Sequence, residues 1–224
     1  MIRIPSLLNA DAVAQINDLL AAASWTDGNE TAGHMSAKVK RNEQIGEDDP
    51  AGHAAAAIVL EALAANALFA SSALPEKISP PLFNRYQNGG SYGLHIDGAI
   101  RPLSAHRMRT DLSATLFLTP QSEYDGGELE IFDMGGASAV KLNAGDLILY
   151  PSGSVHQVTP VIRGARVASF FWVQSLVSSA ECRAMLLQLD TAIQTIPAEE
   201  AWDSHRLSLT ALYHNLIRKW AQTG

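Results

Sequence analysis

The residues best suited to chemistry are a histidine and an aspartate two positions apart, His95 and Asp97, in the glycine-flanked stretch GGSYGLHIDG. In a β-strand, residues i and i+2 point to the same face. We therefore expect the two side chains to lie side by side, with Leu94 and Ile96 on the opposite face. Imidazole and carboxylate both bind metals, so the pair predicts part of a metal site.

A third ligand is available in the stretch YPSGSVHQV, where His156 directly follows a strand-like run. Two histidines and one carboxylate suit Fe(II), and three ligands on one face of an octahedron leave three positions open, as in non-haem iron oxygenases. A His-x-Asp pair alone is a weak signal, because both side chains could simply face solvent. The second histidine favours a metal centre.

A buried cation is predicted shortly after His156. In the run ARVASFFWVQ, strand alternation places Arg166 on the same face as Ala168, Phe170 and Trp172. An unpaired guanidinium among such neighbours is costly to bury, so Arg166 requires an anion, and its planar fork suits the carboxylate of a small molecule. An ordinary salt bridge at the rim is the alternative. Arg163 lies in a turn, where we expect it to be exposed to solvent.

Short strands between residues 79 and 175 are the elements that would position these side chains. The segments read as strands are PLFNRYQ, LHID, DLSATLFL, GELEIFD, AVKL, DLILYP, HQVTPV and VASFFWVQ, separated by turns rich in glycine. About eight short strands predict a double-sheet jelly roll or a similar sandwich. The fold class is therefore mainly β with flanking helices.

Helical patterns precede the strands. Apolar residues recur at helical spacing after Asn9, which is suited to an N-cap, and an alanine-rich helix is expected from Asp49-Pro50 to about Ser72. The polar, aperiodic segment between these helices, residues 26–49, predicts an irregular loop over the body of the protein.

Helices are expected again after the strands. Ser178 and Glu181 fit a capping box before one helix, and a last helix carries the apolar residues from Leu209 to Trp220. Three regions result: an N-terminal helical region that packs on the barrel (1–76), the barrel itself (77–176) and a C-terminal helical extension (177–224).

Hydropathy, net charge and cysteine content argue against several classes of protein. No apolar run approaches the ~20 residues of a membrane span, and the N-terminus lacks the pattern of a signal peptide, so we expect a cytoplasmic protein without a membrane partner. The net charge of −7 disfavours nucleic acid, and a single cysteine, Cys182, cannot form an internal disulfide. The helical flanks are compatible with either a substrate groove or a homo-oligomer contact.

The series His95-x-Asp97, His156 and Arg166 resembles the Fe(II)/2-oxoglutarate-dependent dioxygenases. More narrowly, the chain is similar to the bacterial PKHD-type hydroxylases, relatives of the prolyl 4-hydroxylases. The matching stretches are PLFNRYQNGGSYGLHIDGAI, MRTDLSATLFL, YDGGELEIFD, KLNAGDLILYPSGSVHQVTPVIRGARVASFFWVQS and LYHNLIRKW, which extend from the barrel to the C-terminal helix.

The resemblance implies a distorted double-stranded β-helix, a cupin-like jelly roll, with Fe(II) on His95, Asp97 and His156. It also implies that Arg166 holds the far carboxylate of 2-oxoglutarate, that Tyr86 hydrogen-bonds this cosubstrate, and that O2 and L-ascorbate take part. The reaction would hydroxylate a small molecule or peptide, with release of succinate and CO2.

Other residues of suitable type have more open roles. Tyr92 is expected either to line the substrate mouth or to cap the core, and the loop residue His106 is a weaker candidate for an extra base. The remaining histidines lie in the N-terminal segment or on expected helices; they are His34, His53, His205 and His214.

Two further function classes remain open on sequence grounds. The first is a cupin-like sensor or carrier that binds a metal and a carboxylate without turnover; succinate release under air would separate it from an oxygenase. The second is a zinc hydrolase, which needs a general base beside the metal, and no HExxH motif is present.

Overall fold

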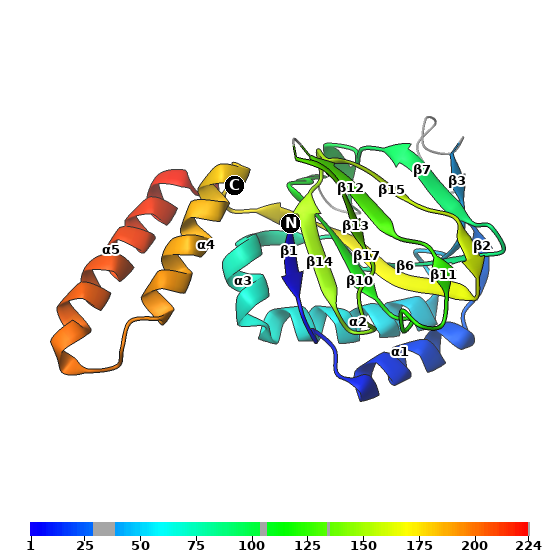
Figure 1. Ribbon diagram of the computed structural model, residues 1–224, viewed down its shortest axis with the longest axis horizontal. Coiled ribbons are helices and arrows are strands. Elements are labelled where there is room, and N and C mark those ends of the chain that lie inside the picture. The colour runs from blue at the N-terminus through cyan, green and yellow to red at the C-terminus, as the bar shows by residue number, and fades with distance from the viewer. Residues whose placement is uncertain (29–38, 104–106, 134, 224) are drawn as a thin grey trace.

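The structure is a computed structural model that describes residues 1–28, 39–103, 107–133 and 135–223. Two antiparallel β-sheets face each other, helices cover the outer side of the larger sheet, and a hairpin of two helices stands beside the barrel (Figure 1). The predicted fold class, mainly β with flanking helices, is confirmed.

The larger sheet has eight strands in the order β1-β14-β10-β17-β6-β4-β2, with β5 paired to β17. Its strands are β1 (Ile2–Ile4), β2 (Trp25–Asp27), β4 (Glu43–Ile45), β5 (Pro75–Ile78), β6 (Leu82–Gln87), β10 (Leu112–Phe117), β14 (Leu147–Pro151) and β17 (Ala165–Ser175).

The smaller sheet has five strands in the order β13-β12-β15-β7-β3, and two two-stranded ribbons accompany it. Its strands are β3 (Lys40–Arg41), β7 (Ser91–His95), β12 (Leu129–Asp133), β13 (Gly136–Val140) and β15 (Val155–Val158); the ribbons pair β8 (Ile100–Pro102) with β9 (Arg107–Arg109) and β11 (Asp125–Gly126) with β16 (Val161–Arg163).

Strand β10 shows how sequence alternation builds the interior. All six of its residues are buried. Leu112, Ala114 and Leu116 join the core that lies between the sheet and the helices, whereas Phe117, on the other face, belongs to the core between the two sheets. Ser113 and Thr115 share that inner face and line a cavity there.

Three helices cover the outer face of the larger sheet: α1 (Ala10–Ala21), α2 (Pro50–Ala65) and α3 (Ala67–Ala73). Asn9 caps α1 as predicted, since its Oδ1 accepts from the backbone N–H of Ala12 at 2.8 Å. Asp49 caps α2 in the same way. The single helix predicted to about Ser72 is wrong, because Asn66 ends α2 and its side chain caps α3.

The irregular loop predicted for residues 26–49 is also wrong where the structure describes this segment. Strands β2 and β4 extend the larger sheet, and β3 pairs with β7 in the smaller one. Strands of two or three residues are too short to show a period in the sequence, which is why pattern reasoning missed them.

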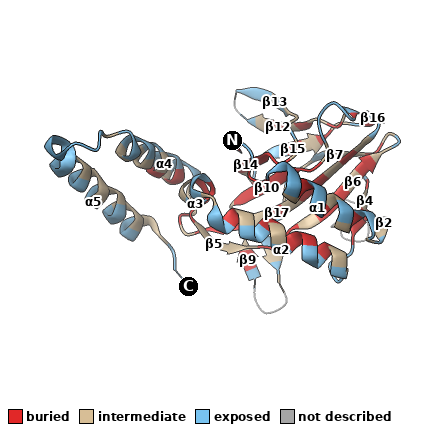
Figure 2. Cartoon of the chain, turned by 90° about the horizontal axis from the view of Figure 1, so that it is seen from below, coloured by how far each residue is buried: buried red, intermediate tan, exposed pale blue. Residues whose placement is uncertain are grey.

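The C-terminal hairpin consists of α4 (Ala180–Gln194) and α5 (Asp203–Trp220), with a 3₁₀ turn (Glu200–Trp202) before α5. Ser179, rather than the predicted Ser178, caps α4, and its hydroxyl also contacts Glu181. Few hairpin residues are buried, in contrast to the barrel (Figure 2). Within the part of the chain that is described, no single helix is long and apolar enough to cross a membrane, although the bent pair α2 and α3 passes that test together.

Candidate active site

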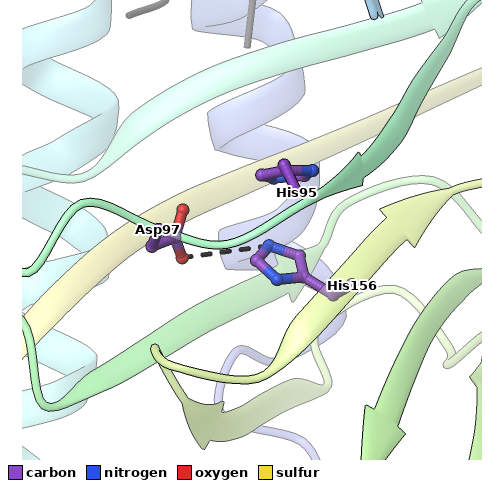
Figure 3. Close-up of side chains that lie close together, drawn as sticks. All are labelled: His95, Asp97 and His156. Carbon is purple, nitrogen blue, oxygen red and sulfur yellow. Dashed lines mark ion pairs between the residues drawn. The ribbon is translucent and has the colours of Figure 1, made fainter. Parts of the chain in front are cut away.

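The three predicted metal ligands converge between the two sheets. His95, Asp97 and His156 each offer a ligand atom, and these atoms lie within 4.8 Å of one another. The side chains come from different elements and point toward a common centre (Figure 3). Spacing alone could not show this for His156, which reaches the site from a distant part of the chain.

Strand pairing places the two histidines. In the smaller sheet β15 pairs with β7, and His156 is directly opposite His95. The ring centroids are 4.1 Å apart. Because directly opposed side chains of an antiparallel pair share one face, both imidazoles project into the cavity.

Backbone carbonyls orient both imidazole rings. The Nδ1 of His95 lies 2.8 Å from the carbonyl oxygen of Gly93, and the Nδ1 of His156 lies 3.0 Å from that of Ser154. A carbonyl only accepts, so each Nδ1 carries the hydrogen and each Nε2 keeps a lone pair for a metal. Burial, together with the neighbouring His156, lowers the pKa of His95 to about 4, which keeps this ring neutral.

Asp97 reaches the site by a different route from the one predicted. Strand β7 ends at His95, so Asp97 lies in the loop that follows rather than two places along the same strand. Its carboxylate accepts a short hydrogen bond from the hydroxyl of Ser113 on β10, and Ser152 lies 2.8 Å from that hydroxyl. The larger sheet therefore holds the aspartate against two histidines of the smaller sheet. Leu94 and Ile96 are both exposed, but Ile96 also lines the cavity, so its predicted place on the opposite face is not confirmed.

Aromatic rings enclose the histidines. Tyr92 stacks on His95 with centroids 3.6 Å apart and planes at 15°, and Tyr150 meets His156 edge to face at 5.1 Å. Tyr92 therefore lines the cavity and also packs against the core between the sheets, so the structure does not choose between the two roles left open for it. We call His95, Asp97 and His156, with these supports, the metal end of the cavity.

Arg166 lies elsewhere in the same cavity, whose volume is about 200 Å³. Only 1% of the residue is exposed, and its Nε has no hydrogen-bond partner among the described residues. Its guanidinium carbon lies 5.4 Å from the ring centroid of Tyr86 and 5.1 Å from that of Phe117. The predicted burial of Arg166 among apolar groups is confirmed. A charge in such a position is stabilised by an anion that arrives with a ligand.

The turn after β11 allows the arginine stem to pack closely. Gly127 has a φ of +68°, and a Cβ at this position would lie 2.8 Å from Val161 and 3.1 Å from the Cδ of Arg166. Both the backbone conformation and the space therefore require glycine here. Tyr124 packs against the same glycine, and its buried hydroxyl has no partner among the described residues.

Tyr86 pairs with Arg166 in the register of β6 and β17. Burial raises the pKa of Tyr86 to about 12, so its phenol remains protonated at neutral pH and can donate a hydrogen bond. We call the lining residues Arg166 and Tyr86, together with the neighbouring Tyr124, the cosubstrate end of the cavity, after the role predicted for the first two.

The remaining candidates lie away from this cavity or outside the described residues. Arg163 is exposed and pairs with Asp125 at 2.6 Å, as its turn position predicted. His53, His205 and His214 are exposed on helices. His34 and His106 fall outside the described residues.

Several cavity residues were missed by sequence reasoning; they are Lys40, Arg101, Ser113, Thr115 and Tyr150. Alternation with apolar neighbours predicts that Asn84 faces outward, and this is wrong, because Asn84 is buried and lines the cavity. A signal existed for two of them, because Ser113 and Thr115 are hydroxyl residues that alternate with apolar ones in a strand without charges. Lys40 and Arg101 had no comparable signal, since each lies in a strand of two or three residues.

The residues present fit a ferrous centre with a dicarboxylate beside it. Two imidazole nitrogens and one carboxylate form the ligand set that leaves open positions on non-haem iron. The buried, incompletely partnered guanidinium of Arg166 lies in the same cavity and matches a carboxylate. Zinc is compatible with the donor atoms, but zinc alone would leave Arg166 without an anion.

Comparison with family models gives two matches. Residues 81–174 match the 2OG-Fe(II) oxygenase superfamily, and residues 181–222 match the C-terminal domain of PKHD-type hydroxylases. The first match contains all three converging ligands and Arg166. The second lies on the helical hairpin.

Curated relatives cover almost the whole chain. A PKHD-type hydroxylase of Burkholderia thailandensis is 53% identical over 224 residues, and one of Phenylobacterium zucineum is 52% identical over 225 residues. Each alignment covers 99% of both chains.

Solved structures share the fold. A Pseudomonas putida prolyl-4-hydroxylase is 25% identical with a TM-score of 0.50, and the alignment covers 78% of this chain and 91% of that one. HygX from Streptomyces hygroscopicus, solved with nickel, 2-oxoglutarate and hygromycin B, has a TM-score of 0.54 at 14% identity and covers 78% and 82%. The second likeness supports the jelly-roll fold alone.

Proposed function

The chain belongs to the PKHD-type hydroxylases of the 2OG-Fe(II) oxygenase superfamily, and from this membership we propose that His95, Asp97 and His156 hold its Fe(II). The enzyme is a dioxygenase that uses O2, Fe(II) and 2-oxoglutarate, and ascorbate is typical of the family. The alternative of a carrier without turnover loses its support, because full-length relatives are named hydroxylases.

One observation supports this ligand assignment above all. Three ligand atoms within 4.8 Å share a cavity with a buried guanidinium whose Nε has no partner in the described part of the chain. When bound, iron and 2-oxoglutarate supply the oxidation, in which the cosubstrate becomes succinate and CO2 and one oxygen atom enters a C–H bond of the substrate.

The protein contributes binding and orientation to this chemistry. The Nε2 atoms of His95 and His156 and the carboxylate of Asp97 bind the metal, while Ser113 restrains the carboxylate through its hydroxyl. Arg166 receives the distal carboxylate of 2-oxoglutarate through charge-assisted hydrogen bonds. The phenol of Tyr86, protonated because of its raised pKa, donates a further hydrogen bond to the cosubstrate.

Iron binding and succinate release test the proposal together. The purified protein should take up one Fe(II) per chain without oxygen and release succinate slowly from 2-oxoglutarate under air, even without substrate. Ascorbate should prolong this turnover, because it returns oxidised iron to Fe(II). An iron-loaded protein that releases no succinate under air would contradict the proposal.

A further inference from the structure

A second cationic group lines the cavity at the level of the metal end. Arg101, on β8, lies over the ring of Trp172 with its guanidinium carbon 4.4 Å from the centroid. Trp172 is directly opposite Ser113 in the pairing of β17 with β10, and Ser113 holds Asp97. Arg101 therefore lies beside the metal end, whereas Arg166 is six positions along β17, roughly 20 Å of strand at about 3.3 Å per residue.

The contacts of Arg101 leave it able to bind a ligand. Its Nη2 donates to the carboxylate of Glu47 at 2.9 Å, and the Glu47 side chain is 60% exposed. A guanidinium has five N–H donors in a planar fork. Stacking on Trp172 restrains that plane, and Arg101 still lines the cavity. An exposed glutamate contributes little to such a pair, because water screens it.

The charge balance of the cavity favours an anion at this place. Among the described lining residues, Asp97 is the only carboxylate, while Lys40, Arg101 and Arg166 are cationic. With the proposed ligands bound, the ferrous charge balances that of 2-oxoglutarate, and Asp97 balances Arg166. Arg101, whose carboxylate partner Glu47 is largely exposed, then remains as positive charge in the lining of a protein whose net charge is −7.

Lys40, on β3, lines the same cavity and adds to this positive field. It is only 5% exposed, donates to the carbonyl of Gly28 at 2.7 Å and lies 5.6 Å from the ring centroid of Tyr92. Burial is the main cause of the lowered pKa of Lys40, Asp27 opposes that shift, and Arg101 contributes a smaller lowering. An anion between the two cations would relieve this repulsion.

The surface next to Arg101 is partly apolar, which limits the kind of molecule that fits. Leu82 and Phe170 pair across β6 and β17 and line the cavity together with Trp172. Asn84, two residues further along β6, is 8% exposed, and its Oδ1 has no partner among the described residues. The lining thus offers a cation, an apolar wall and an amide that requires a hydrogen-bond donor.

We propose that the hydroxylated substrate is a small molecule with a carboxylate, which Arg101 binds on the Trp172 platform while the apolar part lies against Phe170 and Leu82. This inference rests on the proposed function, because it assumes that 2-oxoglutarate occupies Arg166. Recognition of the carboxylate beside the metal end places the oxidised C–H bond close to that group in the substrate.

Matched acids and amides test the inference. Free amino acids, N-acetyl amino acids and aliphatic acids are titrated, each beside its primary amide, into the anaerobic Fe(II) and 2-oxoglutarate complex of the full chain. Calorimetry or ligand-detected NMR measures binding without turnover. At least one acid should bind about tenfold or more tightly than its amide, as expected when a charge-assisted fork is lost. Arg101→Gln should reduce this ratio to near one, whereas Arg163→Gln, in an exposed ion pair, should preserve it.

Three results would overturn the inference: a panel in which every amide binds as well as its acid, an acid preference that persists in Arg101→Gln, or a panel in which no acid binds. A phosphonate analogue that binds more tightly than its carboxylate would assign a different oxyanion and also overturn it. Because the ratio is measured within each variant, a general loss of affinity does not imitate the expected result. Failure of the proposed function is distinct, since the wild-type protein would then fail to bind iron or to release succinate.

Discussion

At the metal end of the cavity, the ligand side chains already have hydrogen-bond partners within the protein. At the cosubstrate end, buried polar atoms have no hydrogen-bond partner among the described residues. The Nδ1 atoms of His95 and His156 contact backbone carbonyls, and Asp97 accepts from Ser113. At the other end, Arg166 Nε and the hydroxyl of Tyr124 lack partners among the described residues.

This difference indicates how each ligand is bound. The protein organises the metal ligands before the metal arrives, so their removal should act on metal affinity directly. We expect the cosubstrate end to be completed by its ligand, because an incoming carboxylate would satisfy the buried guanidinium. Variants at the two ends should therefore separate iron affinity from 2-oxoglutarate affinity.

The largest effect is expected from the loss of a metal ligand. His156→Ala should lower the affinity for Fe(II) by more than about 100-fold. This loss exceeds the one that usually follows when a residue that only supports a metal ligand is replaced. Anaerobic titration with Fe(II) measures this. His205→Ala, on the exposed face of α5, is the matched control and should bind iron normally. Wild-type iron affinity in His156→Ala would exclude this residue from the site.

Arg166→Met should lower the affinity for 2-oxoglutarate and leave the affinity for Fe(II) unchanged. Charge-assisted hydrogen bonds contribute roughly 1.5–3 kcal/mol, so affinity for 2-oxoglutarate should fall by at least about tenfold. Arg166→Lys should lie between, since it keeps the charge and loses the fork. Calorimetry of the anaerobic Fe(II) protein measures these affinities.

The same variant also tests whether the cosubstrate end is incomplete without its ligand. In wild-type protein, 2-oxoglutarate should raise the Tm of the Fe(II) form, whereas Arg166→Met should show a much smaller rise. Arg163→Met should behave as wild type, because that side chain is exposed and paired with Asp125. If Arg166→Met binds 2-oxoglutarate normally, the contrast between the two ends is mistaken.

A smaller effect is expected when the support of Asp97 is removed. Ser113→Ala deletes the hydroxyl that holds the carboxylate and should weaken Fe(II) about tenfold, the lower limit for such supporting residues. Ser169→Ala is a close control, because Ser169 is a fully buried serine on the adjacent strand whose hydroxyl has no partner among the described residues. Equal iron affinities in the two variants would show that the Asp97 contact does not position the ligand.

Much of this site was predictable because residue type and strand period carry its main features. Two histidines and an aspartate are residue types that bind iron, so their presence predicted a metal site. The alternation of residues in β17 correctly predicted that Arg166 is buried. Strand alternation predicted that His95 and Asp97 lie close together, but not how. Strand β7 ends at His95, and a hydrogen bond from Ser113 holds the Asp97 carboxylate in place. A serine hydroxyl can form hydrogen bonds with many nearby backbone groups. The position of Ser113 in the sequence therefore does not predict its hydrogen bond to the distant Asp97.

The fold, like the site, was predictable in its main elements but not in all of its details. Long helices with caps at Asn9 and Asp49 began where their patterns indicated. The break at Asn66 was hidden, because alanine-rich sequence on both sides fits a helix equally well and only the amide side chain marks the new cap. Lys40, in a strand of two residues, reaches the cavity through pairing with β7, a long-range contact without a local signature.

The smallest expected effect concerns Tyr86, which faces Arg166 across β6 and β17. Tyr86→Phe removes one hydroxyl, and a single hydrogen bond contributes about 0.5–1.5 kcal/mol, so affinity for 2-oxoglutarate should fall roughly two- to tenfold. Tyr213→Phe, on the helical hairpin, should leave this affinity unchanged.

The pH dependence distinguishes a donated hydrogen bond from a charge effect at Tyr86. Burial raises the pKa of Tyr86 to about 12, so the phenol stays protonated between pH 6 and pH 9, and the ratio of wild-type to Tyr86→Phe affinities should be constant over that range. Above pH 10 the unfolded chain loses this proton first, so stability should fall as the pH rises from 10 toward 12. Tyr86→Phe should lose that part of the alkaline destabilisation in thermal unfolding scans. A ratio of affinities that changes across neutral pH would mean that Tyr86 does not act as a protonated donor to 2-oxoglutarate.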